Sequence, residues 1–147
     1  MGLLALLIVA CGAGGLAWTL LDSPLAIDPQ DPAAVALGAS LYGRHCAECH
    51  GQQLEGQPGW RVRLPDGKLP APPHDESGHT WHHRDADLFG MVKEGFASGR
   101  YAPPGYLSDM PGYGDTLSDS EIRAVLAYIK STWPEAQRAH QARISGG

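Results

Sequence analysis

Two cysteines three positions apart, with a histidine directly after the second, restrict what this chain can fold into more than any other feature. These residues are Cys46, Cys49 and His50. Thiols at this spacing can each add to one of the two vinyl groups of a haem, and the histidine then lies under the iron as an axial ligand. A redox dithiol is expected near a βαβ pattern, and a zinc site needs a second cysteine pair or a close histidine pair. The chain has no visible βαβ pattern and no second cysteine pair, so we interpret the motif as the attachment site of one covalent c-type haem.

Length and composition fit one small domain built around such a group. The chain has 147 residues, and about 110 of them remain once an apolar leader is set aside, which is close to the commonest domain size. It has only two Phe, and a buried porphyrin would supply the apolar volume that they do not. A formal net charge of -5 and a pI near 5.7 argue against nucleic acid as a partner.

The amino-terminal segment, residues 1–22, is expected to be a membrane anchor. Gly2 to Leu21 contains no charged residue, and about 20 apolar residues span a bilayer as a helix, whereas the apolar part of a cleavable signal has roughly 7–15. Covalent haem attachment takes place outside the cytoplasm, so we expect an uncleaved helix in the bacterial inner membrane, with the domain facing the periplasm. A lipoprotein anchor at Cys11, which follows Ile8-Val9-Ala10, and a cleaved signal are the alternatives. Residues 23–32 contain three prolines and would form a Pro-rich tether.

A helix start is the first structural signal after the tether. Asp31 followed by Pro32 combines a capping carboxylate with a proline in the first turn. The helix would run to about Arg44 and contain Gly38 in its interior. A glycine there costs about 1 kcal/mol relative to alanine. Close approach by another helix would explain it.

Two further helices are predicted closer to the carboxyl end. Ser118–Glu121 has the pattern of a capping box, and apolar residues then repeat at helical spacing over residues 122–133. Another helix is expected from Asp85, acting as its cap, to Glu94, with Gly95 ending it. No strand-like alternation of useful length occurs. We therefore predict an all-α fold of about three to five helices.

Both halves of the chain resemble the class I monohaem cytochromes c. The pattern Gly38-x-x-Leu41-Tyr42-x-x-x-Cys46-x-x-Cys49-His50-Gly51 is similar to the family's opening helix and haem motif. Met110–Ser118 and Tyr128–Lys130 are similar to its distal-ligand loop and closing helix. The resemblance covers about residues 31–134 and implies the cytochrome c fold around one covalent haem c. It also implies that the first and last helices cross with a glycine against an aromatic residue, here Gly38 and Tyr128.

The resemblance further implies that a histidine and a methionine bind the iron from opposite sides. The chain has three methionines. Met1 is excluded by its position, and Met91 is expected to fill the core from the third helix. Met110 lies in a polar, glycine-rich loop where a methionine has no packing role, so it is the expected ligand opposite His50. Thioether ligation would raise the reduction potential, and two filled axial sites would let the iron transfer electrons while excluding substrates.

A histidine-rich segment over residues 74–83 contains four histidines and two carboxylates. Such a segment could bind copper or zinc, with His79, His82 and His83 as ligands. We favour the alternative, a polar loop whose histidines pack at the haem edge or lie in solvent.

Side chains that could bind the haem propionates lie in the same half of the chain. Trp81 could donate its indole N–H, since a buried tryptophan normally finds an acceptor. Arg61 could pair with a propionate, as could Arg63 and Arg84, although solvation at the surface explains each arginine equally well.

His50 should donate its second ring nitrogen to a backbone carbonyl, which would fix the orientation of the imidazole. The resemblance implies a proline carbonyl downstream of the motif, and the Pro-rich stretch that contains most candidates is expected to wrap one haem edge. The candidates are Pro58, Pro65, Pro70, Pro72 and Pro73.

Together these features predict a membrane-tethered one-electron carrier rather than an enzyme. Residues 33–134 would form the haem domain, and residues 135–147 a C-terminal tail that is frayed or used for docking. The redox partner proteins would be a quinol-oxidising complex as donor and a terminal oxidase or reductase as acceptor. One alternative is a haem-based sensor or enzyme in which Met110 is displaceable. The other is a copper-handling module that uses residues 74–83.

Overall fold

The computed structural model describes residues 27–96 and 99–146, and the regular structure within these ranges is entirely helical. The elements are α1 (Pro32–His45), α2 (Ala47–His50), the 3-10 helix η1 (Thr80–His82), α3 (Asp85–Glu94), α4 (Asp119–Ser131) and α5 (Glu135–Ser145). The all-α prediction is confirmed for this part of the chain. The expected membrane anchor lies outside the described residues, and no helix among those described is long and apolar enough to cross a membrane.

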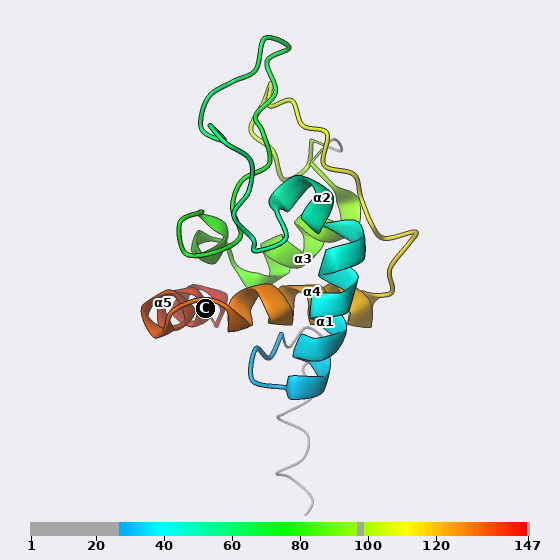
Figure 1. Cartoon of the computed structure of the whole chain (residues 1–147), viewed down its shortest axis with the longest axis vertical. Coiled ribbons are helices and arrows are strands. Elements are labelled where there is room, and N and C mark those ends of the chain that lie inside the picture. Colours follow the sequence, from blue (N-terminus) through cyan, green and yellow to red (C-terminus); the bar gives the residue numbers. More distant parts are fainter. Residues whose placement is uncertain (1–26, 97–98, 147) are drawn as a thin grey trace, which may run out of the picture.

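Helices α1 and α4 cross in direct contact and support the rest of the domain (Figure 1). A Cβ added to Gly38 would lie 2.5 Å from the carbonyl carbon of Ala124 and 2.9 Å from the Cβ of Tyr128. The rings of Tyr42 and Tyr128 lie 5.4 Å apart beside this crossing. The prediction that Gly38 marks the close approach of another helix, with an aromatic residue against it, is therefore confirmed.

Helix α4 begins with the predicted capping box. The hydroxyl of Ser118 accepts the backbone N–H of Glu121, and the Glu121 carboxylate accepts the backbone N–H of Ser118 at 2.9 Å. The helix ends at Ser131, two residues earlier than the apolar spacing predicts, because a residue before a proline, here Trp133 before Pro134, is disfavoured in the α conformation. Its inner face is buried, as predicted, through Ile122, Val125, Leu126 and Ile129.

Helix α3 has the predicted bounds but a different start. It runs over Asp85–Glu94 and ends at Gly95, whose φ is 73°. The N-cap position is Arg84, without a side-chain cap, and Asp85 is the first helical residue. The prediction that Asp85 caps the helix was wrong, because its two carboxylate oxygens instead accept the ammonium of Lys130 at 2.8 and 2.9 Å.

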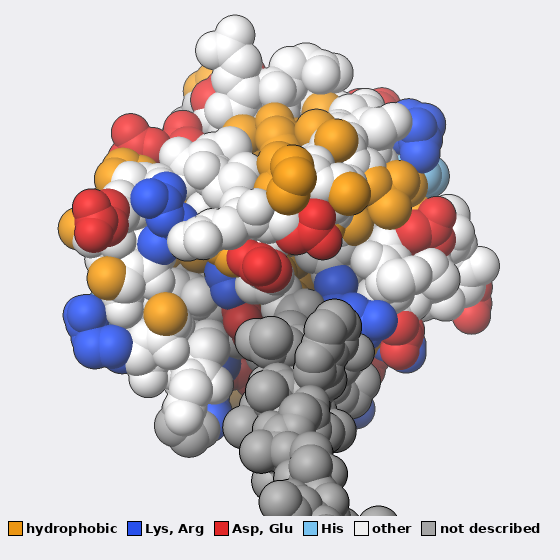
Figure 2. All heavy atoms as spheres, turned by 90° about the horizontal axis from the view of Figure 1, so that it is seen from below, with side chains coloured by type: hydrophobic (Ala, Val, Ile, Leu, Met, Phe, Trp, Pro, Cys, Tyr) orange, Lys and Arg blue, Asp and Glu red, His pale blue; other side chains and the backbone are white. Residues whose placement is uncertain are grey.

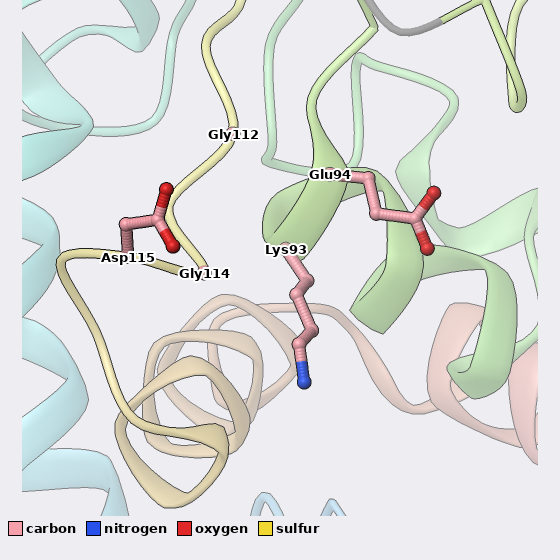
Figure 3. A pocket seen from close by; sticks show the side chains of 5 residues that line it. All are labelled: Lys93, Glu94, Gly112, Gly114 and Asp115. Atoms are coloured by element: carbon pink, nitrogen blue, oxygen red, sulfur yellow. The ribbon is translucent and has the colours of Figure 1, made fainter.

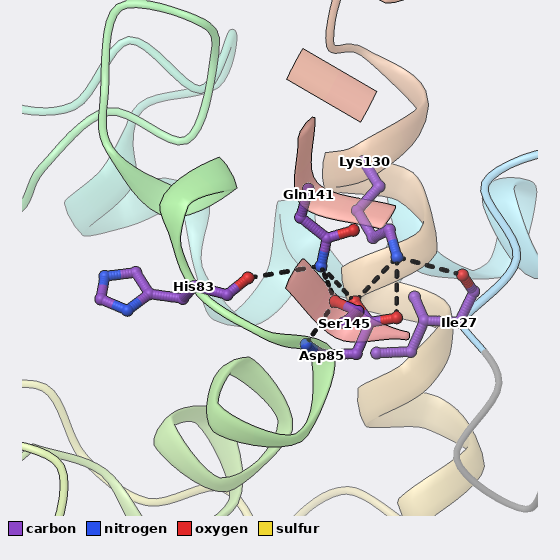
Figure 4. Close-up of polar contacts among 6 residues, drawn as sticks. All are labelled: Ile27, His83, Asp85, Lys130, Gln141 and Ser145. Carbon is purple, nitrogen blue, oxygen red and sulfur yellow. Dashed lines mark hydrogen bonds and ion pairs between the residues drawn. The ribbon is translucent and has the colours of Figure 1, made fainter. Parts of the chain in front are cut away.

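The segment expected only as a tail contains α5, and a buried polar cluster holds that helix to the domain. Gln141 is fully buried, and its amide nitrogen donates to Asp85 at 2.5 Å and to the carbonyl of His83 at 3.4 Å. Lys130 also donates to the carbonyl of Ile27 at 3.3 Å. Figure 4 shows these groups converging from the start of the described chain, α3, α4 and α5. The cluster thus joins both ends of the described chain to the helices between them.

Charges of both signs cover the end of the molecule where α1 starts. Figure 2 looks onto this end and shows Lys and Arg side chains interspersed with Asp and Glu, beside a group of apolar side chains. Interspersed charges produce little of the concentrated positive potential that attracts nucleic acid. The mixed charges on this face are consistent with the net charge of -5, which also argues against nucleic acid as a partner.

Candidate haem site

The two cysteines of the motif belong to the short helix α2 and its N-cap. Cys46 lies between the two helices, as the C-cap of α1 and the N-cap of α2, and Cys49 is the third residue of α2. Both are free thiols, with Cys46 half-buried and Cys49 exposed. Burial, with a smaller contribution from Cys49 beside it, raises the pKa of the Cys46 thiol to about 11. These sulfurs stand in for the thioether sulfurs of a haem-loaded protein, which do not titrate.

His50 is buried, and its ring is held by one backbone carbonyl. The Nδ1 of His50 lies 2.9 Å from the carbonyl oxygen of Pro72. Because a carbonyl can only accept, Nδ1 carries the proton and donates it, and Nε2 is left for a metal. Burial lowers the pKa of His50, and the bond to Pro72 opposes this shift only in part, so the ring stays neutral, as ligation requires. Among the candidate prolines, Pro72 provides the carbonyl.

Two ring side chains, Tyr42 of α1 and His74 of the loop after Pro72, contact this histidine. The hydroxyl of Tyr42 donates to the carbonyl of His50 at 3.3 Å and to the next carbonyl along the chain at 3.1 Å. Burial raises the pKa of Tyr42, so the phenol remains a donor. The ring of His74 stacks on that of His50, and Trp133 donates its indole N–H to the carbonyl of His74 at 2.7 Å. These contacts fix the loop that carries Pro72.

The loop that contains Met110 is fastened to the end of α3. The backbone N–H groups of Tyr113 and Gly114 donate to the carbonyls of Val92 and Lys93, each at 2.9 Å. These carbonyls belong to the last turn of the helix, which has no helical partners to offer them. Figure 3 shows the loop running past the end of α3, with the side chain of Lys93 pointing away toward α4. The loop therefore completes the hydrogen bonding of α3.

Glycines allow this loop and α3 to come close enough for those bonds. A Cβ on Gly95 would lie 2.5 Å from the backbone nitrogen of Gly112 and 2.8 Å from the carbonyl oxygen of Met110. The hydroxyl of Tyr113 donates to the carbonyl of His45 at 2.6 Å, one residue before the haem motif. Met110, which is half-buried, thus lies on a loop that is tied both to α3 and to the end of α1.

The residues predicted to bind propionates have partners within the protein. The indole nitrogen of Trp81 donates to the carbonyl of Glu76 at 3.4 Å. The guanidinium of Arg61 lies 3.9 Å above the ring of Trp60, and Arg63 donates to a loop carbonyl at 2.6 Å. The role of these side chains toward a propionate stays a prediction.

The histidine-rich segment forms pairs of rings. His79 lies 5.4 Å from His83, and His82 lies 5.4 Å from His140 of α5, measured between ring centroids. Burial is the main cause that lowers the pKa of both His79 and His83. Within residues 27–96 and 99–146, no group of three or more His, Cys, Asp or Glu side chains is arranged to hold a metal ion. The second metal site stays a prediction.

Two side chains at the site were not assigned a role by sequence reasoning. In the sequence, His74 stands out only as a member of the histidine-rich segment. Its place beside His50 depends on which proline carbonyl accepts the bond from His50, and the sequence offers five candidates. Tyr113 was not singled out, although an aromatic residue in a polar, glycine-rich loop is a signal that could have found it.

The residues present fit a covalently attached haem. Two thiols lie three positions apart at one short helix, followed by a neutral imidazole whose Nδ1 is committed to Pro72 and whose Nε2 is not. The profile of the cytochrome c family matches residues 35–133. This chain belongs to the cytochrome c family. The cofactor of cytochrome c is covalently bound haem c, and Cys46, Cys49 and His50 fit its attachment motif.

Curated relatives of this cytochrome c bear the name Cbb3-type cytochrome c oxidase subunit FixP. The protein of Rhizobium meliloti strain 1021 is 27% identical over 109 residues, which are 73% of this chain and 33% of the relative. The protein of Sinorhizobium medicae strain WSM419 is 26% identical over 136 residues, which are 89% of this chain and 42% of the relative. The chain thus spans less than half the length of either. No solved structure matches it significantly. The family and these relatives indicate haem-based electron transfer.

Proposed function

We propose that this cytochrome c is a membrane-tethered one-electron carrier whose single haem iron is bound by His50 and Met110. The observation that carries the proposal is the 2.9 Å bond from His50 Nδ1 to the Pro72 carbonyl. That bond fixes the tautomer and directs Nε2 toward ligation, which is the usual way that an outer partner prepares a metal-binding histidine.

The placement of Met110 supports the second ligand. Its loop is bonded to the carbonyls of Val92 and Lys93 and, through the hydroxyl of Tyr113, to the carbonyl of His45. A loop fixed at two places would hold Met110 close to a bound haem, so an external ligand would compete poorly for the iron. The other described methionine, Met91, is a buried member of the core and is the weaker candidate.

A bound haem would supply a reversible one-electron couple, and the protein residues would keep its surroundings constant while the electron moves. The Nδ1 proton of His50 is hydrogen-bonded to the Pro72 carbonyl, so the ligand would keep its proton during electron transfer. A thioether opposite histidine favours the ferrous state and raises the potential. With both axial positions filled, the iron would serve transfer rather than substrate binding.

The cellular setting is part of the proposal. The uncharged stretch from Gly2 to Leu21 would hold the haem domain at the periplasmic face of the bacterial inner membrane. A quinol-oxidising complex would be the donor and a terminal oxidase or reductase the acceptor. The relatives named as subunits of a cbb3-type oxidase support a respiratory setting. Redox encounters bury little surface, and a shared membrane raises the effective concentration of the partners.

Carbon monoxide binding to the reduced protein tests the proposal. The wild-type spectrum is expected to stay unchanged when carbon monoxide is added, because Met110 occupies the site that the gas would take. Met110→Ala is expected to bind the gas at once and serves as the positive control. Immediate binding by the wild type would overturn the carrier proposal and favour a sensor or an enzyme with a displaceable methionine.

A further inference from the structure

His74 occupies an unusual place beside His50, the proposed iron ligand. The ring centroids of His74 and His50 lie 3.9 Å apart with 23° between the ring planes, which is a stacked arrangement. The ring of His74 also meets the ring of Tyr42 edge-on, at 6.1 Å between centroids. The His74 ring thus contacts both the proposed iron ligand and a buried residue of α1.

The backbone of His74 is fixed on both sides of this ring. Its N–H donates to the carbonyl of Leu54 at 2.8 Å, and its carbonyl accepts the indole N–H of Trp133 at 2.7 Å. Trp133 is itself buried, with 1% of its surface exposed. The backbone that carries the His74 ring is therefore held in place beside His50.

Hydrogen bonds within the described part of the chain do not explain why an imidazole stands at this position. The Nδ1 of His74 is buried and has no hydrogen-bond partner within the described part of the chain. An unsatisfied buried polar atom costs roughly 1–3 kcal/mol, and such an atom in a native structure calls for a specific explanation. An aliphatic residue would avoid this cost, but it would not present a flat face to His50.

We propose that His74 is a positioning residue that sets the plane of the His50 imidazole at the haem. This inference rests on the proposed role of His50 as an axial ligand. The bond to Pro72 fixes the Nδ1 edge of the His50 ring but allows the ring to pivot about that bond. Stacking against His74 blocks the pivot. Partners in the outer shell of a metal site are known to orient the ligands and tune the metal in this way.

Two other roles for His74 make different predictions. If only its backbone bonds to Leu54 and Trp133 matter, any side chain serves. If the side chain only fills space, leucine serves as well as histidine. Under the proposal, a flat ring is required. His74 as a whole residue is half-buried, and phenylalanine is the substitution that keeps a flat ring at this position.

The experiment compares His74→Phe and His74→Leu with His79→Leu as the matched control, since His79 lies in the same segment and stacks on Trp60 rather than on His50. Haem-loaded ferric proteins are examined by electron paramagnetic resonance and by proton resonance of the haem methyl groups. Both report the direction of the axial imidazole plane. The thioether-to-iron band is recorded for every variant, so a failure of the proposed His/Met ligation is seen separately, as loss of that band in the wild type.

The expected result is that His74→Leu changes the order of the haem methyl shifts and the largest g value, while His74→Phe and His79→Leu keep the wild-type pattern. An unchanged pattern in His74→Leu would overturn the proposal. A change in both His74 variants would overturn it too, because the effect would then depend on a nitrogen atom and not on the ring face. If His74→Leu does not load haem, His74→Met replaces it, since methionine also lacks a flat face, and the same outcomes apply.

Discussion

Replacing Gly38 with alanine should destabilise the protein, although alanine is the better helix former. In an isolated helix the change would gain about 1 kcal/mol. Here the new methyl would lie 2.5 Å from the carbonyl carbon of Ala124 and 2.9 Å from the Cβ of Tyr128, whereas carbon atoms pack at about 3.5–4.0 Å. The nearest neighbour is backbone and cannot rotate away. Helices α1 and α4 must therefore separate by about 1 Å.

The free energy of unfolding should fall by about 2 kcal/mol. Inserting a methyl into a packed core costs typically about 1–3 kcal/mol. The upper end of that range applies, because a gap of about 0.5–1 Å removes a quarter to a half of the energy of each contact across it. Subtracting the helix gain of about 1 kcal/mol leaves about 2 kcal/mol. For a domain of this size, that lowers Tm by about 8 °C.

Thermal and urea unfolding of the haem-loaded protein, followed by circular dichroism, measure this loss. Gly43→Ala is the matched control, since Gly43 lies on the same helix and a Cβ added there meets no atom within 4 Å. That variant should gain about 0.5–1 kcal/mol. If Gly38→Ala were as stable as the wild type, or more stable, the close crossing of α1 and α4 would be refuted.

Three further predictions concern polar contacts. Trp133→Phe removes the indole N–H that the His74 carbonyl accepts at 2.7 Å. Urea unfolding should show that the free energy of unfolding falls by about 1–2 kcal/mol. An unchanged midpoint would contradict this bond. Lys130→Met leaves the Asp85 carboxylate, whose side chain is only 22% exposed, without its cation, and the same assay should show a loss of about 3 kcal/mol. Adding Asp85→Asn should restore part of that loss, and no recovery would argue against the pair. Cap hydrogen bonds lower the pKa of Glu121 below its ordinary 4.5, so its stabilisation is present above pH 4.5 and is lost as the pH falls through the lowered pKa. The stability difference from Glu121→Gln should shrink over that interval, and a pH-independent difference would count against the cap.

The parts of the fold that sequence predicts well depend on short-range chemistry. The capping box at Ser118 and the stop at Gly95 require only neighbouring residues, and both occur as predicted. Gly38 could be interpreted because an interior helix glycine has a cost that only a close partner explains. The haem motif is equally local, since its spacing alone suits the two attachment points.

The parts that sequence did not predict depend on contacts between distant segments. Asp85 looks like a cap, but Lys130 of α4 binds its carboxylate, and no local pattern signals that pair. Helix α5 has little apolar periodicity, and it is held by the buried amide of Gln141. Similarly, five prolines could serve His50 equally well in sequence. Only the path of the loop selects Pro72 and brings His74 onto the ligand.

The most direct test of the central claim is the far-red absorption of the ferric protein, where a thioether bound to iron gives a charge-transfer band. Met110→Ala is compared with Met91→Leu, which changes the methionine buried in the core and keeps its volume. The band should be present in the wild type and in Met91→Leu and absent in Met110→Ala. If the band persists in Met110→Ala, or is absent from the wild type, Met110 is not the iron ligand and the closed electron-transfer site is contradicted.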